Sequence, residues 1–523
     1  MVIAFACCYI EKNNSIESSF CPMLRLKHLP IDTGKENIAF INKRCPDLQT
    51  EEGGGSSSRI EIHGGLQPLF VSIYICEDDS LVKPDEIALT DQAFHLISMS
   101  EGSEVAIAPA AAPASIDSVR RKINGGILSA KEYRSIISDL SAYRYTPIEL
   151  AAFLVSNASF MSPQEVLSMT EALIEHRQPV DWGINLVVDE HCIGGIPANR
   201  TKMIVLPIAI AYGLCMPGTT TRSVTSCSSV ADAMEVLTGV ELSETEAGKT
   251  VNEIGGCLVL DGQRLAMSAT EDLLMSLERA LGISTPQQIV ASIISSKIAM
   301  GITHLLVDIP VGKTAKIRTM SEAMSLRKLF EYVGDMLSMK IDVIVTDGSE
   351  PVGNGIGPVL EARDVMKVLR CREDAPQDLR EKALFMAGKV LEFDPQLRGG
   401  QGYYQAREIL DSGRALEVMS QIVHAQGKQT PPPLGQLTRD VTAPISGVIS
   451  EIDGQQLNRI AMTAGAPHNK GAGIDLMKKV GDQVEQGEVL YRIYSCKPTS
   501  FAFANGLAEG ADGYKIMSSG ITY

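Results

Sequence analysis

Residues 187–212 read VVDEHCIGGIPANRTKMIVLPIAIAY, and this stretch indicates the class of fold. Val187-Val188 predicts a short buried strand, Gly194-Gly195 a turn, and Lys202–Tyr212 a buried helix. A strand that leads through a glycine-rich turn into a helix is typical of α/β proteins, and amide groups at such a turn can hold an anion. We therefore expect an α/β protein in which this turn is one candidate for binding a ligand. A tight turn without a ligand is the alternative interpretation.

Upstream of this stretch the chain predicts two kinds of structure. Residues 1–110 alternate short β-type runs with turn residues, which indicates a small β-rich domain. An Ala-Pro linker at 108–115 precedes a helical period that continues to about residue 174. Helices are expected to begin at Ser115, Ser129, Thr146-Pro147 and Ser162-Pro163.

Downstream, strands alternate with helices between about Gly239 and Arg439, which predicts an α/β layer. The expected strands are Cys257–Leu260, His304–Ile309 and Ile341–Thr346, and the expected helices are Ser321–Leu337 and Pro376–Val390. Lys428–Gly435 contains three consecutive prolines and marks a boundary. The tail from Val441 predicts β-hairpins at 442–449 and 480–490, a pattern also found in biotin and lipoyl carriers, but it lacks their Met-Lys-Met acceptor.

The prediction for the whole chain is a multidomain α/β protein. It has a small N-terminal β-rich domain (1–110), a mainly helical lobe with phosphate-binding segments (111–240), a large α/β lobe with a central mixed sheet (241–434) and a C-terminal α+β domain with β-hairpins (435–523).

The composition is that of a globular protein that does not bind nucleic acid. Of 523 residues 45% are hydrophobic, the net charge is −16, and the longest basic run is Arg120-Arg121-Lys122. No apolar run reaches the ~18 residues of a membrane span. Met1–Ile10 lacks the basic start of a signal peptide. The 11 cysteines show no CxxC spacing, so we expect reduced thiols in a cytoplasmic protein.

Two further segments carry groups suited to anions and sugars. Gly218–Ser229 consists almost entirely of Gly, Ser, Thr and Arg and leads into the apolar-spaced run Ala231–Leu237. The second segment has Ser292, Ser296 and Lys297 near one helical face, followed by a buried strand and a glycine with two lysines, Lys313 and Lys316. The alternative interpretations are a polar surface loop and a solvated lysine loop.

Taken together and in order, these segments resemble the thymidine/pyrimidine-nucleoside phosphorylase family, in particular its longer branch that includes archaeal AMP phosphorylase. The landmarks of the resemblance are Pro30–Gly34, Leu81–Leu89, Glu149–Leu154, Asp189–Thr201, Thr221–Glu235, Asp308–Lys313 and Gly357–Arg363. The resemblance implies a homodimer in which phosphate and a nucleoside meet between a helical and an α/β lobe. Phosphate would attack the anomeric carbon, release the base and leave an α-pentose 1-phosphate, with no metal and no cofactor.

Site residues carry over by position. The resemblance implies phosphate binding by Cys192, Gly194, Gly195, Thr201 and Thr220, and catalytic roles for His191, Arg279 and Thr285. It implies nucleoside or nucleotide binding by Gly195, Thr221, Arg222, Ser223, Val224, Thr225, Ser226, Val230, Ser292 and Lys316.

Five positions depart from the family pattern. Glu190 stands where the family has a lysine before the histidine, and Ser229-Val230 stands where it has Gly-Thr. Thr285 replaces the aspartate of an Asp-Pro pair, and Ser296 replaces the first of two lysines. The leading hypothesis is phosphorolysis of thymidine or another pyrimidine nucleoside. The alternatives are an AMP-type nucleotide phosphorylase, with Arg222 and Lys316 as partners of the 5′-phosphate, and a homologue that binds a nucleoside without turnover.

Overall fold

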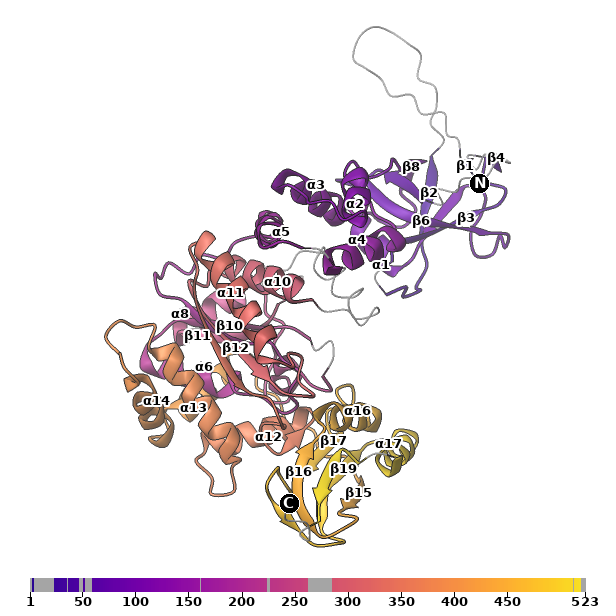
Figure 1. Ribbon diagram of the computed structural model, residues 1–523. Coiled ribbons are helices and arrows are strands. Elements are labelled where there is room, and N and C mark those ends of the chain that lie inside the picture. Colours follow the sequence, from indigo (N-terminus) through magenta and orange to yellow (C-terminus); the bar gives the residue numbers. More distant parts are fainter. Residues whose placement is uncertain are drawn as a thin grey trace. The chain divides into compact units, whose positions relative to one another are not determined.

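The computed structural model describes residues 2–3, 23–34, 36–46, 50–51, 59–159, 161–222, 226–261, 285–510 and 512–518. Its contacts divide the chain into two compact units, Met1–Phe160 and Met161–Tyr523, whose elements are labelled in Figure 1. The four ranges given above therefore stay a proposal about the domains, and each unit is described here by itself.

The first unit contains a closed barrel with strand order β2-β7-β3-β6-β5-β8, which confirms the predicted β-rich part. Its strands are β2 (Leu24–His28), β3 (Ile38–Asn42), β5 (Arg59–His63), β6 (Leu69–Cys76), β7 (Glu86–Leu89) and β8 (Glu104–Pro109); the unit also has the short pair β1 (Val2–Ile3) and β4 (Thr50–Glu51). Helix α1 (Asp91–Ile97) packs against β6 and β7. Closure pairs the barrel's edges, and alternate Ile, Leu and Val side chains fill its interior.

Four helices begin where the sequence predicts. They are α2 (Ile116–Ile123), α3 (Ala130–Ser141) and α4 (Pro147–Ser159) in the first unit, and α5 (Pro163–Glu175) in the second. Ser129 and Ser162 each form a capping box with the glutamate three residues later, which satisfies amide groups at the helix start. The local sequence signals are sufficient here because a cap depends on only four neighbouring residues.

The second unit is built on parallel strands. The order β13-β12-β9 joins Lys340–Asp347, His304–Val311 and Val188–Cys192, and β10 (Met216–Thr220) pairs with β11 (Gly256–Leu260). A parallel bridge from Val187 to Cys215 connects β9 with β10. All pairings among these five strands are parallel. Among the described strands of this lobe the sheet is therefore not mixed, as was predicted, but parallel, because helical crossovers and not hairpins join the strands. Strands β9 and β10 also come from the range predicted as mainly helical.

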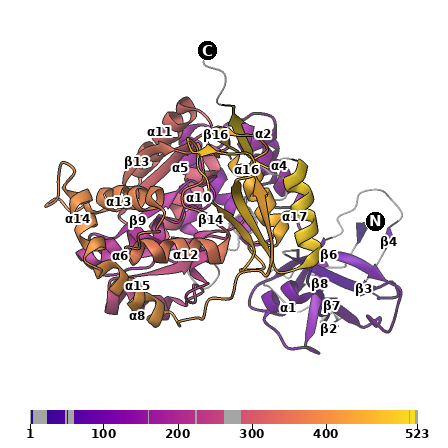
Figure 2. The same cartoon turned by 90° about the horizontal axis from the view of Figure 1, so that it is seen from below.

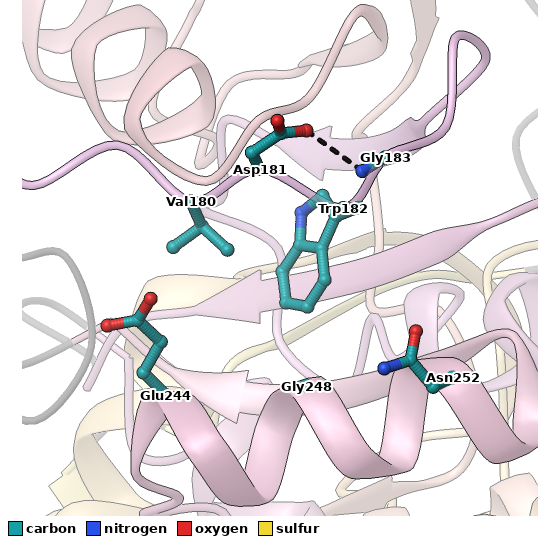
Figure 3. A pocket seen from close by; sticks show the side chains of 7 residues that line it. All are labelled: Val180, Asp181, Trp182, Gly183, Glu244, Gly248 and Asn252. Carbon is teal, nitrogen blue, oxygen red and sulfur yellow. Dashed lines mark hydrogen bonds between the residues drawn. The ribbon is translucent and has the colours of Figure 1, made fainter.

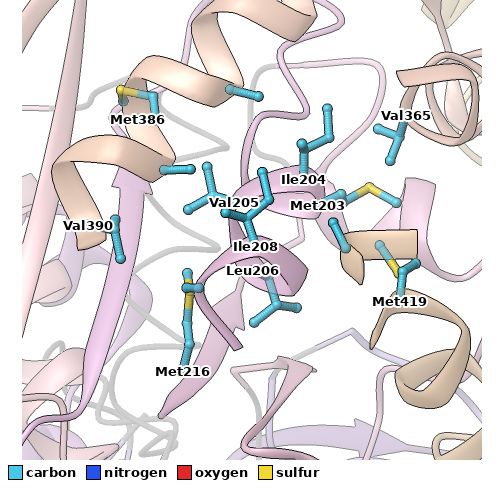
Figure 4. Close-up of a cluster of buried hydrophobic side chains, with 14 of the residues drawn as sticks. Met203, Ile204, Val205, Leu206, Ile208, Met216, Val365, Met386, Val390 and Met419 are labelled. Atoms are coloured by element: carbon cyan, nitrogen blue, oxygen red, sulfur yellow. The ribbon is translucent and has the colours of Figure 1, made fainter. Parts of the chain in front are cut away.

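Helix α6 (Lys202–Tyr212) forms the centre of the main core and has the predicted bounds. Every residue from Lys202 to Ile210 is buried. Helices α13 (Gln377–Leu391), α14 (Gln401–Asp411) and α15 (Arg414–Ala425) pack against α6, and Figure 2 labels all four. Figure 4 shows Met386 and Val390 of α13 and Met419 of α15 near the side chains of α6. The other helices of this layer are α7 (Val230–Met234), α8 (Glu244–Ile254), α10 (Pro286–Ala299), α11 (Met320–Met336) and α12 (Pro358–Leu369).

The C-terminal part is α+β, as predicted, but its strands pair differently. One sheet has the order β14-β17-β19-β15 and the other β18-β16-β20, and all their pairs are antiparallel. The elements are β14 (Gly355–Ile356), β15 (Leu437–Thr442), β16 (Gly447–Ile452), α16 (Gly454–Ala464), β17 (Gly473–Leu476), β18 (Gln483–Val484), β19 (Val489–Ser495), α17 (Pro498–Gly510) and β20 (Tyr514–Met517). The hairpins predicted at 442–449 and 480–490 are both wrong, because each segment carries the chain from one sheet to the other.

Candidate active site

Strand β9 presents different chemistry on its two faces. The strand continues through Cys192, so the acidic and histidine positions predicted to follow the strand lie within it. Side chains alternate along a strand, which places Asp189 and His191 on one face and Glu190 and Cys192 on the other. Helix α10 supplies a partner to the first face, and α13 packs against β9 on the second.

Asp189 binds two lysines in the interior. Its Oδ1 lies 2.7 Å from Nζ of Lys202 and its Oδ2 lies 2.6 Å from Nζ of Lys297. Lys202 also donates to the backbone oxygens of Glu190 and Thr219, at 2.7 Å each, and Lys297 donates to the Thr219 hydroxyl. These contacts join α6, α10, β9 and β10 around one buried carboxylate.

The pKa values around Asp189 follow from this arrangement. Burial alone would raise the pKa of Asp189, but the two ammonium groups hold it below its ordinary value. Burial lowers the pKa of Lys202 to about 8 in spite of Asp189. Burial, reinforced by Lys297 and Lys202, also lowers the pKa of His191 well below its ordinary value. At neutral pH His191 is therefore an uncharged imidazole that can donate or accept one hydrogen bond.

The glycine turn after β9 contacts the loop that follows β12. Gly194 and Gly195 both have positive φ, +90° and +88°. A Cβ built on Gly194 meets open space, whereas one on Gly195 would lie 2.8 Å from Cβ of Lys316 and would also collide with its backbone nitrogen. The structure thus brings Gly195 and Lys316 together, as their common assignment to nucleoside binding requires, and Lys316 is close enough to His191 to lower its pKa. Only glycine permits this approach.

The second face of β9 holds a polar group under α13. Asp308, which pairs with Cys192 in the β9–β12 register, lies 2.9 Å from Nζ of Lys382 and accepts a hydrogen bond from the Thr346 hydroxyl at 2.6 Å. Asn199 donates to Sγ of Cys192 at 3.3 Å. Burial, with Asp308 as the next cause, raises the pKa of the Cys192 thiol well above its ordinary value. Cys192 is therefore a neutral thiol and not an activated nucleophile.

Glu190 is the most unusual group of this face. Its residue is 1% exposed, and within the described part of the chain neither carboxylate oxygen has a hydrogen-bond partner. Burial raises its pKa to about 7. Two nearby arginines in the sequence are engaged elsewhere: Arg200 binds Glu361 at 2.6 Å, and Arg222 binds other carboxylates.

The Thr220–Val230 segment offers less free positive charge to a substrate than the sequence indicated. Gly218, Thr219 and Thr220 belong to β10 and are buried, so the predicted polar loop begins only at Thr221. Arg222 is paired with Asp232, Glu235 and Glu241 at 3.2, 2.6 and 3.0 Å, which neutralises it as a partner for a 5′-phosphate. Val230 begins α7 and packs against the main core, and Ser226 lies partly exposed before it.

Helix α10 places its polar residues on structural partners. Thr285 caps the helix by accepting a hydrogen bond from the Gln288 amide at 3.3 Å. Ser296, which replaces a family lysine, donates to the buried carboxylate of Asp261, and Ser292 lies partly exposed one turn earlier. Thr201 is 1% exposed directly before α6. Arg279, Ser223, Val224 and Thr225 lie outside the described residues, so their predicted roles stay predictions.

Sequence reasoning missed the charged residues that organise the site. The sequence indicates no role for four residues that form buried or largely buried ion pairs: Asp189, Asp308, Lys202 and Lys382. The sequence signal for these residues is a charged residue inside or next to an apolar strand or helix. Such a residue is expected to be buried and must then have a partner of opposite charge. The partner itself could not be read from sequence, since it lies far away in the chain.

A separate cavity of about 400 Å³ lies away from the predicted site residues (Figure 3). Trp182 forms one wall, and its indole nitrogen donates to the Met300 carbonyl at 2.6 Å. Glu244, Gly248 and Asn252 of α8 line the opposite side. Among the described residues, none that is predicted for phosphate or nucleoside lines this cavity.

Two other kinds of feature are missing from the described residues. Among them, no group of three or more His, Cys, Asp and Glu side chains could hold a metal ion. In the same part of the chain, no helix has both the length and the apolar character that crossing a membrane requires.

The sequence matches two family models and many curated proteins. Residues 116–177 match the glycosyl transferase family helical bundle domain, and residues 448–511 match the pyrimidine nucleoside phosphorylase C-terminal domain. A protein of Rhodopseudomonas palustris (strain BisA53) named "Putative thymidine phosphorylase" is 48% identical, with 95% of this chain and 96% of that protein covered. A protein of the same name from Methylococcus capsulatus (strain ATCC 33009 / NCIMB 11132 / Bath) is 45% identical, covering 96% and 97%.

A solved structure also matches. It is the crystal structure of an anthranilate phosphoribosyltransferase from Thermus thermophilus, with a TM-score of 0.49 and 18% identity, and the match covers 59% of this chain and 99% of that chain.

The full-length relatives place this protein in a class of pentosyltransferases of the glycosyltransferase type. Within that class, the chain belongs to the pyrimidine nucleoside phosphorylase family. Membership confirms the family resemblance noted from the sequence and implies phosphate and a nucleoside as the substrates.

Proposed function

We propose that this chain catalyses phosphorolysis of thymidine, giving the free base and 2-deoxy-α-D-ribose 1-phosphate. The observation that carries the proposal is the convergence of His191, Gly195 and Lys316 at the carboxyl ends of two adjacent parallel strands, β9 and β12. Ligands of α/β proteins bind at this edge of the sheet.

Phosphate would occupy the turn formed by Cys192, Gly194 and Gly195, with the hydroxyls of Thr201 and Thr220 beside it. The turn suits a tetrahedral oxyanion because it offers amide donors next to the start of α6. The sugar and base would lie along Gly195, Thr221–Ser226, Val230, Ser292 and Lys316.

The chemistry needs position more than a protein nucleophile. Departure of the base gives the sugar oxocarbenium character, and a phosphate held beside the anomeric carbon both stabilises and captures it. Neutral His191 can hydrogen-bond to the base or sugar, and we propose Arg279 and Thr285 as further groups at the base. The Asp189–Lys297 ion pair connects β9, which carries His191, to α10.

Nucleotide phosphorolysis is the second candidate, and one observation argues against it. Arg222, the expected partner of a 5′-phosphate, is already paired with three carboxylates. Lys316 alone would have to compensate the 5′-phosphate, whereas an uncharged nucleoside needs no such compensation.

The test is a comparison of substrates. Purified protein is incubated with thymidine, uridine, cytidine and AMP, each with and without phosphate, and free base is quantified by chromatography. Phosphate-dependent release of thymine but not adenine supports the proposal. Adenine release from AMP alone would select the nucleotide phosphorylase, and saturable thymidine binding without release would show a homologue that only binds its ligand.

A further inference from the structure

Glu190 occupies an environment that disfavours its charged form. The residue is 1% exposed, and no described residue donates a hydrogen bond to either carboxylate oxygen. An ionised carboxylate in this position loses its hydration without replacement, whereas the neutral acid loses much less.

Charged groups of α6, α13, β12 and β9 act on Glu190, whereas β10, which also packs against β9, carries no charged side chain. Lys202 of α6, Lys382 of α13, Asp308 of β12 and the neighbouring Asp189 all act on its carboxylate, and its charge acts on the Cys192 thiol. Each of the two lysines is already bound to another carboxylate, Lys202 to Asp189 at 2.7 Å and Lys382 to Asp308 at 2.9 Å. Neither is a dedicated partner of Glu190.

Glu190 and these four residues, together with Lys297, which is bound to Asp189, form one charge group. It contains three ammonium groups and three carboxylates. With Glu190 ionised the group is neutral, and with Glu190 protonated it carries one positive charge. An anion at the adjacent Cys192–Gly195 turn is therefore held better when Glu190 carries a proton. Same-side residues of a strand lie ~7 Å apart, where Coulomb's law with an effective dielectric of ~20 gives roughly a 50-fold change in affinity per unit charge.

We propose that Glu190 takes up one proton when an oxyanion binds at the Cys192–Gly195 turn. The coupling rests on the phosphate site of the proposed function and adds a positioning residue to it. The proton comes from solvent and stays on the carboxyl, so no bond of the substrate is involved. Glu190 thus supplies, by losing its own charge, the positive potential that a lysine at this position would supply by carrying one.

The proton is exchangeable in the neutral range because burial raises the pKa of Glu190 to about 7. At about pH 8 the free protein is mostly ionised at Glu190, and anion binding then draws in a proton. The same linkage predicts that affinity for an anion of constant charge falls by up to tenfold for each pH unit above about 7.

The experiment uses sulfate, because phosphate itself titrates near neutral pH and sulfate does not. Isothermal calorimetry on the full chain, in buffers of different ionisation enthalpy, measures the number of protons taken up per sulfate bound. We expect the natural protein to take up close to one proton more per sulfate at about pH 8 than Glu190→Gln, in which only groups such as Lys202, with a pKa of about 8, still titrate. The sulfate affinity of Glu190→Gln should vary less with pH than that of the natural protein.

Glu350→Gln is the matched control. Burial also raises the pKa of Glu350, but its carboxylate accepts a hydrogen bond from the Val480 amide at 2.9 Å and has no place in the anion site. It should retain the proton uptake of the natural protein. An undiminished uptake in Glu190→Gln would assign the proton to another group such as Lys202 or His191, and would overturn the proposal.

The natural protein alone also tests the proposal, in case Glu190→Gln does not fold. Sulfate binding without proton uptake at about pH 8 would overturn it. Linked proton uptake in a protein that releases no base from any nucleoside or nucleotide would support this coupling and contradict the proposed function. Phosphorolysis without linked uptake would contradict the coupling alone.

Discussion

Asp189 and Lys297 lie 108 positions apart in the chain and form a buried ion pair of 2.6 Å. Together with Lys202 they place two ammonium groups on a single carboxylate beneath the edge of the parallel sheet. This ion pair connects α10 to β9, the strand that carries His191.

The first prediction concerns Asp189. Asp189→Asn should lower the free energy of unfolding by about 3–5 kcal/mol, because two buried ammonium groups lose their counter-charge. The measurement is denaturant unfolding of the purified variant. Breaking the half-exposed pair Arg327–Glu331 by Glu331→Gln is the control and should cost less than about 1 kcal/mol. An equal loss of unfolding free energy in the two variants would show that the Asp189 ion pairs contribute no more to stability than a surface ion pair.

The second prediction compares the two turn glycines. Gly194→Ala and Gly195→Ala both place a side chain at positive φ, which costs on the order of 1 kcal/mol. Only Gly195→Ala also pushes a Cβ into Lys316. Gly195→Ala should therefore lower kcat/KM at least tenfold more than Gly194→Ala, measured as phosphate-dependent base release. Similar losses would mean that the approach of Lys316 is not needed for activity.

The third prediction concerns the lysines after β12. Lys316→Ala should cost about 1.5–3 kcal/mol of transition-state stabilisation, since it removes a charge-assisted hydrogen bond to the substrate. Lys313 is the matched control in the same loop: it is exposed and pairs with Glu451 at 2.8 Å. Steady-state kinetics should show a loss for Lys316→Ala and none for Lys313→Ala. Unchanged kinetics in both variants would mean that Lys316 is a solvated loop residue with no role in substrate binding.

The fourth prediction is that Cys192→Ser retains phosphorolysis within about threefold. Its pKa lies well above the ordinary value, so the thiol is neutral at working pH, and the reaction needs no covalent intermediate. Serine keeps an acceptor for the Asn199 amide that now donates to sulfur. Complete loss of activity, together with a glycosyl adduct on Cys192 seen by mass spectrometry, would contradict attack by phosphate.

The fifth prediction is a pH dependence of stability. Below about pH 4.5 Glu190 is neutral in the folded and the unfolded chain; above that pH the unfolded chain ionises while the folded chain keeps its proton until about pH 7. The natural protein should thus lose on the order of 2–3 kcal/mol relative to Glu190→Gln as pH rises through this window, and nothing more above it. Thermal midpoints at about pH 5 and about pH 8 measure the change, and a constant difference between the proteins would contradict it.

Local signals were sufficient where a few neighbouring residues decide the structure. Ser129 and Ser162 begin helices because their hydroxyls satisfy amide groups within one turn, and these starts are confirmed. The uninterrupted apolar run of α6 likewise predicted a buried helix with its bounds. Both predicted C-terminal hairpins were wrong because strand pairing depends on distant partners: β15 pairs with β19, which lies about fifty residues further along the chain, and β18 pairs with β16.

The sequence by itself determined the alternation of strands and helices, the glycine turn after β9 and the family landmarks, because each depends on residue type and spacing along the chain. Only the tertiary structure decided which charges meet. Lys297 binds Asp189, Lys382 binds Asp308, and Glu190 has no hydrogen-bond partner among the described residues. These groups meet because the parallel sheet pairs β9 with β12, which lies more than one hundred residues further along the chain. Buried charges have energies set by their neighbours in space, and those neighbours are not the residues beside them in sequence.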